Sequence, residues 1–180
     1  MILDERVRND SYASCYRNND AGVHGGFSND DRLPAKSVVV SLIIGHTARA
    51  YPLALAEQQP VINDRLDETP VLVTFGSDGK TGIVFDRRLD GRTLTFDPRP
   101  NEPDAMVDRE TDSSWQRLTG RALSGPMRGR ELTQQTATTS FWFGWHDFFC
   151  ETTVFDLDSP GSAGWEPGSD GYRRDWSERA

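Results

Sequence analysis

Lysine is almost absent from this chain of 180 residues: it occurs only as Lys36 and Lys80. Arginine therefore carries nearly all the positive charge, and the net charge is −8 with an isoelectric point of about 4.8. Neutralising phosphates requires a basic face, so this composition predicts no nucleic-acid partner and no anionic membrane surface as a partner. Two explanations of the bias stay open. A dense acidic surface is typical of salt-adapted proteins, and a GC-rich genome favours arginine codons without such selection.

Cysteine and histidine are also scarce. The two cysteines, Cys15 and Cys150, allow one disulfide or none, and the chain has no CxxC motif, haem-attachment motif or zinc-ligand spacing. The histidines are His24, His46 and His146, and no two of them have the spacing of paired ligands on one helix or strand. We therefore expect no metal, no cofactor and no catalytic residue that the sequence alone identifies.

Long hydrophobic runs are missing as well. None approaches the roughly 18 apolar residues of a membrane-spanning helix. The first residues, Met1–Arg6, lack the basic segment and apolar segment of a signal peptide. These absences predict no membrane span and favour a cytoplasmic location. Apolar residues form 36% of the chain and include five Trp and nine Phe, enough for a modest core in a single domain.

What the chain does contain is a series of short apolar runs separated by turn residues. Glycine, Asn and Asp mark turns at Gly45–Thr47, Gly76–Lys80 and Asp90-Gly91, and three prolines indicate a loop over 97–103. The intervening runs have the length and composition of strands. The predicted strands are Val38–Ile44, Ala48–Tyr51, Val71–Phe75, Gly82–Asp86, Arg92–Phe96, Ala105–Arg109 and Val154-Phe155, with shorter candidates at Leu118–Leu123 and Gly129–Leu132.

Two short helices complete the predicted elements. Pro52 suits the first turn of a helix that extends to Gln58. Aromatic residues at helical spacing over 141–149 predict a second helix, with Ser140 as its N-cap. The predicted fold is mainly β: a single antiparallel domain, barrel-like or sandwich-like. We expect a polar N-terminal arm over 1–36, the β-rich domain over 37–158 and an extended tail over 159–180.

Residues 37–155 resemble DUF3179, a prokaryotic family of unknown function. The resemblance rests on the order and spacing of several short segments: Ala48–Pro52, Val61–Asp64, Pro70–Phe75, Val84–Arg87, Asp90–Phe96 and Asp108–Thr111. It implies a β-rich framework and no settled activity.

The chain departs from the family pattern where chemistry is expected. Gln59-Pro60 stands in place of a His-Glu pair, and Gly76–Thr81 stands in place of a Cys-Pro-x-Cys-Gly-Thr loop. Phe149 and Cys150 replace a further His and Pro. In the family, such His and Cys residues would suit a metal or redox centre. Their replacement implies that this copy is not a catalyst.

Polar residues at strand ends form a candidate pocket. Carboxylates there could act as acid–base groups, and they could equally form ion pairs and turn hydrogen bonds that fix loops. The loop Gly76–Thr81 could cradle an anion, but a hairpin turn is the favoured reading. The candidate pocket residues are Asn63, Asp64, Asp78, Asp86 and Arg87.

Aromatic and arginine residues in the polar tail form a candidate interface, since such residues commonly anchor protein contacts. They are Trp165, Tyr172, Arg173, Arg174 and Trp176. We therefore predict a non-catalytic structural or binding protein in a homo- or hetero-assembly. The alternative is an enzyme or small-ligand-binding protein with a polar pocket near Asp64, Asp78 and Asp86. A cleft at 75–80 favours the alternative, and a closed surface turn favours the first reading.

Overall fold

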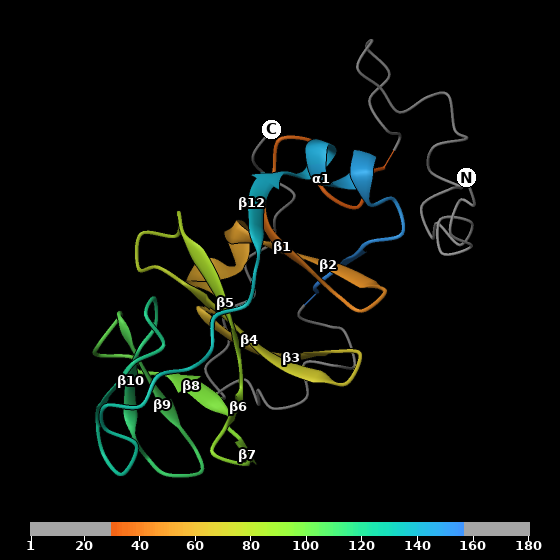
Figure 1. Cartoon of the computed structure of the whole chain (residues 1–180). Helices are drawn as coiled ribbons and strands as arrows, with labels where there is room; N and C mark the ends of the chain where they lie inside the picture. Colours follow the sequence, from red (N-terminus) through yellow and green to blue (C-terminus); the bar gives the residue numbers. More distant parts are fainter. Residues whose placement is uncertain (1–29, 157–180) are drawn as a thin grey trace, which may run out of the picture.

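The computed structural model describes residues 30–156, which fold into stacked β-sheets (Figure 1). The first sheet has the order β12-β1-β2-β13 and the central sheet the order β3-β4-β5. The third sheet has the order β11-β10-β9-β8, and β6 and β7 form a small hairpin. All pairs are antiparallel except β13 with β2. The mainly β, antiparallel architecture predicted from sequence is confirmed, and its open, stacked sheets are sandwich-like.

The strands are short. In chain order they are β1 Val38–Ile44, β2 Thr47–Pro52, β3 Val61–Leu66, β4 Thr69–Phe75, β5 Gly82–Asp86, β6 Arg88–Leu89, β7 Arg92–Thr93, β8 Phe96–Pro98, β9 Ala105–Asp108, β10 Ser114–Gln116, β11 Ala122–Ser124, β12 Thr138–Phe141 and β13 Thr153–Val154. A 3-10 helix spans Leu53–Glu57, and α1 spans Trp142–Phe148. Within residues 30–156, neither is long and apolar enough to cross a bilayer.

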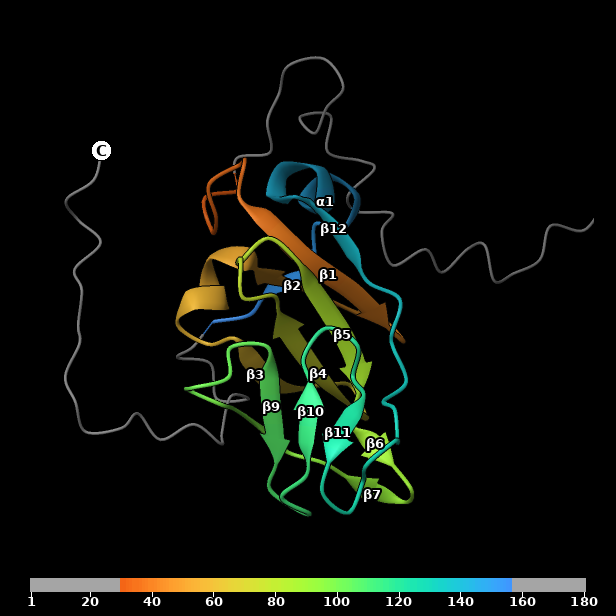
Figure 2. The same ribbon diagram turned by 90° about the vertical axis from the view of Figure 1, so that its left-hand side faces the viewer.

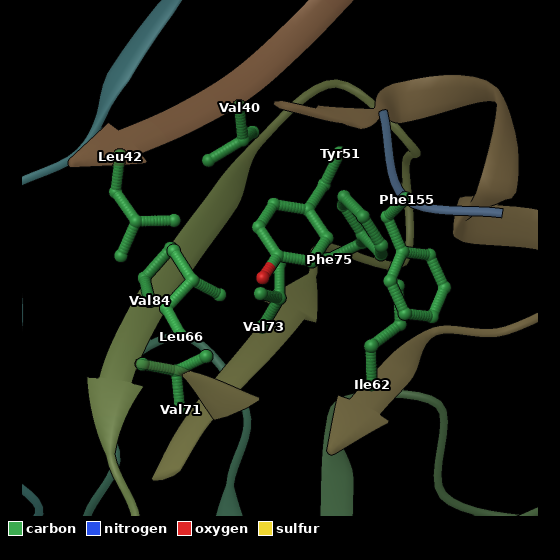
Figure 3. Packing of buried hydrophobic residues seen from close by; sticks show 10 residues of the cluster. All are labelled: Val40, Leu42, Tyr51, Ile62, Leu66, Val71, Val73, Phe75, Val84 and Phe155. Atoms are coloured by element: carbon green, nitrogen blue, oxygen red, sulfur yellow. The ribbon is translucent and has the colours of Figure 1, made fainter. Parts of the chain in front are cut away.

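The central sheet is covered on both faces, which explains why β4 is so apolar. Alternate residues Val71, Val73 and Phe75 pack toward the first sheet (Figure 3). Leu72 packs the other way, against the third sheet and the ring of Trp115. Figure 2 shows β10 and β11 in front of β4 and β5. A strand that is buried on both faces has a nearly continuous hydrophobic sequence.

The outer face of the first sheet is covered in part by α1. Trp142 and Trp145 of the helix are buried against Val39, Ala48 and Ala50. The molecule is therefore layered as helix, sheet, sheet and sheet. Ser140 does not cap α1 as expected from sequence. It lies in β12, where it pairs with Val39 of β1, and no side chain caps the helix.

Several predicted boundaries were wrong. The strand β3 was not predicted, because Asn63, Asp64 and Arg65 interrupt its apolar pattern. The predicted strand Arg92–Phe96 is divided between β7 and β8, which belong to different sheets. The Asp90-Gly91 turn itself is as expected: both residues have positive φ, which suits a tight hairpin.

The remaining differences lie in the third sheet. Asp97 and Pro98 belong to β8 rather than to a loop, and β10 was missed. Only Ala122 onward forms a strand in the region of Leu118–Leu123, and the region of Gly129–Leu132 forms a single bridge. These strands have three residues each, too few for an alternating pattern to emerge.

Candidate functional site

Asp64 on β3 is the centre of a buried polar cluster between the first and central sheets. Its side chain is 1% exposed. One carboxylate oxygen accepts hydrogen bonds from Arg49 Nη1 and from the Tyr51 hydroxyl, each at 2.7 Å, and the other accepts the Arg65 amide at 2.7 Å. Arg49 also donates from Nε to the Thr153 hydroxyl at 3.0 Å. The cluster therefore joins β2, β3 and β13.

Burial and charge shift the pKa values of this cluster. Burial and the neighbouring carboxylate of Asp64 raise the pKa of Tyr51 well above its ordinary value, so its hydroxyl stays protonated and donates. Burial opposes ionisation of Arg49, but the hydrogen bond and charge of Asp64 outweigh it and raise the pKa of Arg49. The cluster is thus a charge-assisted network of fixed donors and one acceptor.

Arg87 and Asn63 belong to the same region but bind backbone. Arg87 donates to the Leu94 carbonyl at 3.0 Å and to the Asp64 carbonyl at 3.2 Å. Burial lowers the pKa of Arg87, and the charges of Glu110, Asp64 and Asp86 oppose that shift. Asn63 donates to the Phe96 carbonyl at 2.7 Å and accepts the Phe96 amide at 2.9 Å. Its amide thereby completes a link between the central and third sheets.

The other two members of the candidate pocket lie elsewhere. Asp86 is in the cross-strand row Asp64–Val71–Asp86, two strands from Asp64, and it holds Arg88 in an ion pair at 2.6 Å. Asp78 lies in the turn beyond the opposite end of β4, where it accepts the Lys80 amide at 3.0 Å. The structure therefore brings Asp64, Arg87 and Asn63 together and places Asp78 apart from them.

A second buried carboxylate, Asp108 on β9, is a strand-end carboxylate outside the candidate pocket. It accepts the Trp115 indole N–H at 2.8 Å, the Thr111 amide at 2.6 Å and the Thr111 hydroxyl at 2.8 Å. Ser113 adds its amide at 3.2 Å. The motif Asp108–Thr111 is thus a turn built around one fully paired carboxylate.

Two of the departures from the expected family motif, Gln59-Pro60 and Gly76–Thr81, meet at one end of the central sheet. The Phe75 amide donates to the Pro60 carbonyl at 3.0 Å, which sets Gln59-Pro60 beside the start of the Gly76–Thr81 turn. That turn is closed by the Gly76 amide, which donates to the Thr81 carbonyl at 2.8 Å. Phe149 and Cys150 lie just beyond α1, on the outer layer.

The described histidines do not form a metal site. His146 of α1 bonds Asp30 at 2.8 Å, and His46 lies in the turn between β1 and β2. In the part of the chain that the structure describes, no three His, Cys, Asp or Glu side chains are grouped for a metal ion. His24 and the candidate interface residues Trp165, Tyr172, Arg173, Arg174 and Trp176 lie outside the described residues.

A groove of about 510 Å³ opens beside α1, on the outer face of the first sheet. Its walls are mainly apolar and include Ile43, which is 41% exposed, and Phe148, which is 66% exposed. Ser41 and Ser140 also line the groove, and their hydroxyl oxygens are buried without a hydrogen-bond partner among residues 30–156. The predicted aromatic face of the helix is therefore divided: Trp142 and Trp145 are core, and Phe148 is not.

Comparison with known proteins gives one match. The model of the DUF3179 family, described as proteins of unknown function, matches residues 20–175. The chain belongs to the DUF3179 family. No curated protein and no solved structure matches it. Membership therefore agrees with the resemblance seen in the sequence, and it assigns this DUF3179 protein no reaction.

Proposed function

We propose that this DUF3179 protein is a non-catalytic subunit of a protein assembly, which binds a neighbouring copy through the groove beside α1. The observation that carries the proposal is the exposed apolar wall of that groove. Phe148 is 66% exposed and Ile43 is 41% exposed, and both line the groove. Clustered apolar side chains that remain exposed are typical of interaction sites.

The polar residues offer less support for catalysis. The side-chain oxygens of Asp64 and the amide of Asn63 are occupied by partners within the chain. The 76–80 segment is a closed turn, because its amides bond within the turn. Acid–base chemistry requires a carboxylate within reach of a substrate proton. The alternative, an enzyme or ligand-binding protein with a pocket near Asp64, Asp78 and Asp86, is thus the weaker proposal.

The occupant that best fits the groove is the aromatic segment 159–180 of a neighbouring copy. Its Trp165 and Trp176 carry large side chains that can fill an apolar groove. The described chain ends just after β13, at the edge of the first sheet opposite β12. Segment 159–180 of the same chain is the competing occupant, and the melting temperature of the deletion variant distinguishes the two.

The test is to delete residues 159–180 and to measure particle mass by light scattering together with the melting temperature. We expect the assembly to dissociate with little change in the melting temperature of the monomer. Phe148→Ser in the full chain should dissociate it too. Leu123→Ser, which alters an equally apolar and 49% exposed residue on β11, serves as the matched control and should not.

Two outcomes contradict the proposal. If the full chain is already monomeric in light scattering, there is no assembly and the proposal is wrong. A monomer whose melting temperature falls on deletion shows that the segment packs on its own domain.

A further inference from the structure

The strand β12 is an edge of the first sheet. It pairs with β1 on one side, and no described strand lies on its other side (Figure 2). Just beyond β12, the Trp142 amide donates to the Ser37 carbonyl at 2.8 Å, in register with the ladder. Hydrogen-bonded pairs alternate along an antiparallel ladder, so the amides and carbonyls of Thr139 and Phe141 point away from β1. These backbone groups have no hydrogen-bond partner in the described part of the chain.

The edge at β12 lacks the features that usually protect an edge strand, which are charges, proline and bulges. From Leu132 to His146 the chain has no Asp, Glu, Lys or Arg, although these residues form 27% of the whole sequence. The register of β12 with β1 runs without a shift, and β12 contains no proline. The opposite edge, β13, has only two residues and lies between Glu151 and Asp156. Of the two edges of this sheet, β12 is therefore the one suited to pairing.

An exposed apolar patch accompanies the free backbone groups. Thr138 and Ser140 line the groove beside α1, so strand alternation puts Thr139 and Phe141 on the opposite face of β12. Phe141 is 49% exposed, and its ring stacks on that of Phe143 with 5.9 Å between the centroids. A strand added at this edge would gain apolar contacts as well as backbone hydrogen bonds.

We infer that β12 pairs antiparallel with β12 of a neighbouring copy, so that the first sheets of two copies form one continuous sheet. The two residues with outward-facing groups, Thr139 and Phe141, are separated by Ser140 alone. About a two-fold axis beside Ser140, Thr139 of each copy lies opposite Phe141 of the other. Both of these pairs are hydrogen-bonded pairs of the new ladder. The edge is therefore complementary to itself.

Charge favours a second copy at this edge. Each copy has a net charge of −8, so contacts through charged surfaces would bring like charges together. The uncharged stretch around β12 lets two copies meet without that repulsion. The inference rests on the proposed function for its partner, a neighbouring copy of the chain, and it adds a second contact to the one in the groove.

The experiment compares Thr139→Pro with Thr139→Val in the full chain. Proline removes an amide that points away from β1, a position on an edge strand where proline is tolerated. Valine keeps the amide and the shape of threonine. T139P removes two hydrogen bonds per pair of copies, so the dissociation constant in analytical ultracentrifugation should rise roughly tenfold or more. T139V should match the wild type, and both variants should keep the melting temperature of the monomer.

Hydrogen exchange in the wild type tests the pairing without a variant. The amides of Thr139 and Phe141 should exchange slowly at concentrations where the chain is assembled and quickly after dilution to the monomer. The Ser140 amide, which faces β1, is the internal control and should stay protected in both states.

Equal dissociation constants for T139P and T139V overturn the inference, and so do rapidly exchanging Thr139 and Phe141 amides in the assembled chain. If T139P does not fold, the exchange measurement decides alone. The groove and the edge can fail separately, because Thr139 does not line the groove. An assembly that survives T139P but not the deletion of 159–180 contradicts only the edge, and the reverse result contradicts only the groove. A monomeric full chain contradicts both.

Discussion

Asp64 and Arg117 are both buried charges beside the central sheet, and the fold surrounds them very differently. Asp64 lies toward the first sheet, where β2 supplies Arg49 and Tyr51 as partners. Arg117, which follows β10 and is 3% exposed, lies toward the third sheet, where its buried Nε has no hydrogen-bond partner among the described residues. A buried charge that is fully paired serves structure, whereas one left unpaired has a desolvation cost that only a further partner offsets.

The family segments and Arg117 differ in the same way. The segments that carry the family resemblance supply Arg49, Tyr51, Asn63, Asp64 and Asp108, and all of these make hydrogen bonds within the chain. Arg117 belongs to none of those segments. Strong sequence motifs here mark the framework, and the incomplete polar group lies between them.

The largest effect should come from Asp108→Asn, which tests whether a paired carboxylate is structural. The new amide group would face the N–H and O–H donors of Thr111, Ser113 and Trp115. We expect a loss of about 4 kcal/mol in the free energy of unfolding, measured by urea denaturation. Asp112→Asn, an exposed neighbour, is the control. A loss equal to that of the control would refute a structural role for the buried carboxylate.

Asp64→Asn should be the next most damaging change. It leaves Arg49 and Tyr51 without their anionic acceptor, and we expect a loss of about 3 kcal/mol in the same measurement. Asp97→Asn, which breaks the exposed ion pair with Arg109, should change stability little. If D64N unfolds at the urea concentration of the wild type, Asp64 is free for another role.

Arg117→Met should act in the opposite direction. Removing an unpaired buried charge should stabilise the fold by about 2 kcal/mol, since methionine fills a similar apolar space. The measurement is urea denaturation in a chloride buffer. A destabilised R117M would show that the guanidinium already has a partner, and the contrast with Asp64 would disappear.

The pH dependence of stability sharpens the same contrast at Tyr51. Its pKa is raised in the folded state, so its contribution is complete below the unfolded value of about 10 and is lost as the pH rises through the folded value. Wild-type stability should therefore fall steeply above about pH 10. Tyr51→Phe should lose about 1 kcal/mol at neutral pH through the missing hydrogen bond. Its alkaline decline should be shallower, and an unchanged alkaline slope would rule out Tyr51 as the titrating group.

The smallest effect should be the change in melting temperature when salt screens the acidic surface. With a net charge of −8, screening by molar KCl should raise the melting temperature by a few degrees over low salt. The control is a variant in which exposed acidic residues are replaced by Asn and Gln until the net charge is near zero. An equal gain in that control would leave genome composition as the explanation of the scarce lysine.

Local pattern was sufficient for the elements with a strong, regular signal. The apolar run Val38–Ile44 became β1 with the predicted bounds, Gly82–Asp86 became β5, and Asp90-Gly91 formed a tight turn. In these segments β-branched residues and turn residues act through their own backbone preferences, so neighbours in the sequence decide the outcome. The family, too, was recognisable from the spacing of short segments.

Tertiary packing decided the remainder. No local signal predicts that Asn63 bonds the backbone of Phe96, 33 residues away. Nor does one predict that β3 tolerates the carboxylate of Asp64, because the partners Arg49 and Tyr51 come from β2. Likewise, the sequence around Arg117 is that of an ordinary surface arginine. Its burial and the missing partner of its Nε follow only from the stacking of the sheets. The physical reason is that pairing and desolvation of a polar group depend on residues from distant strands, and their registers are set only when the layers pack together.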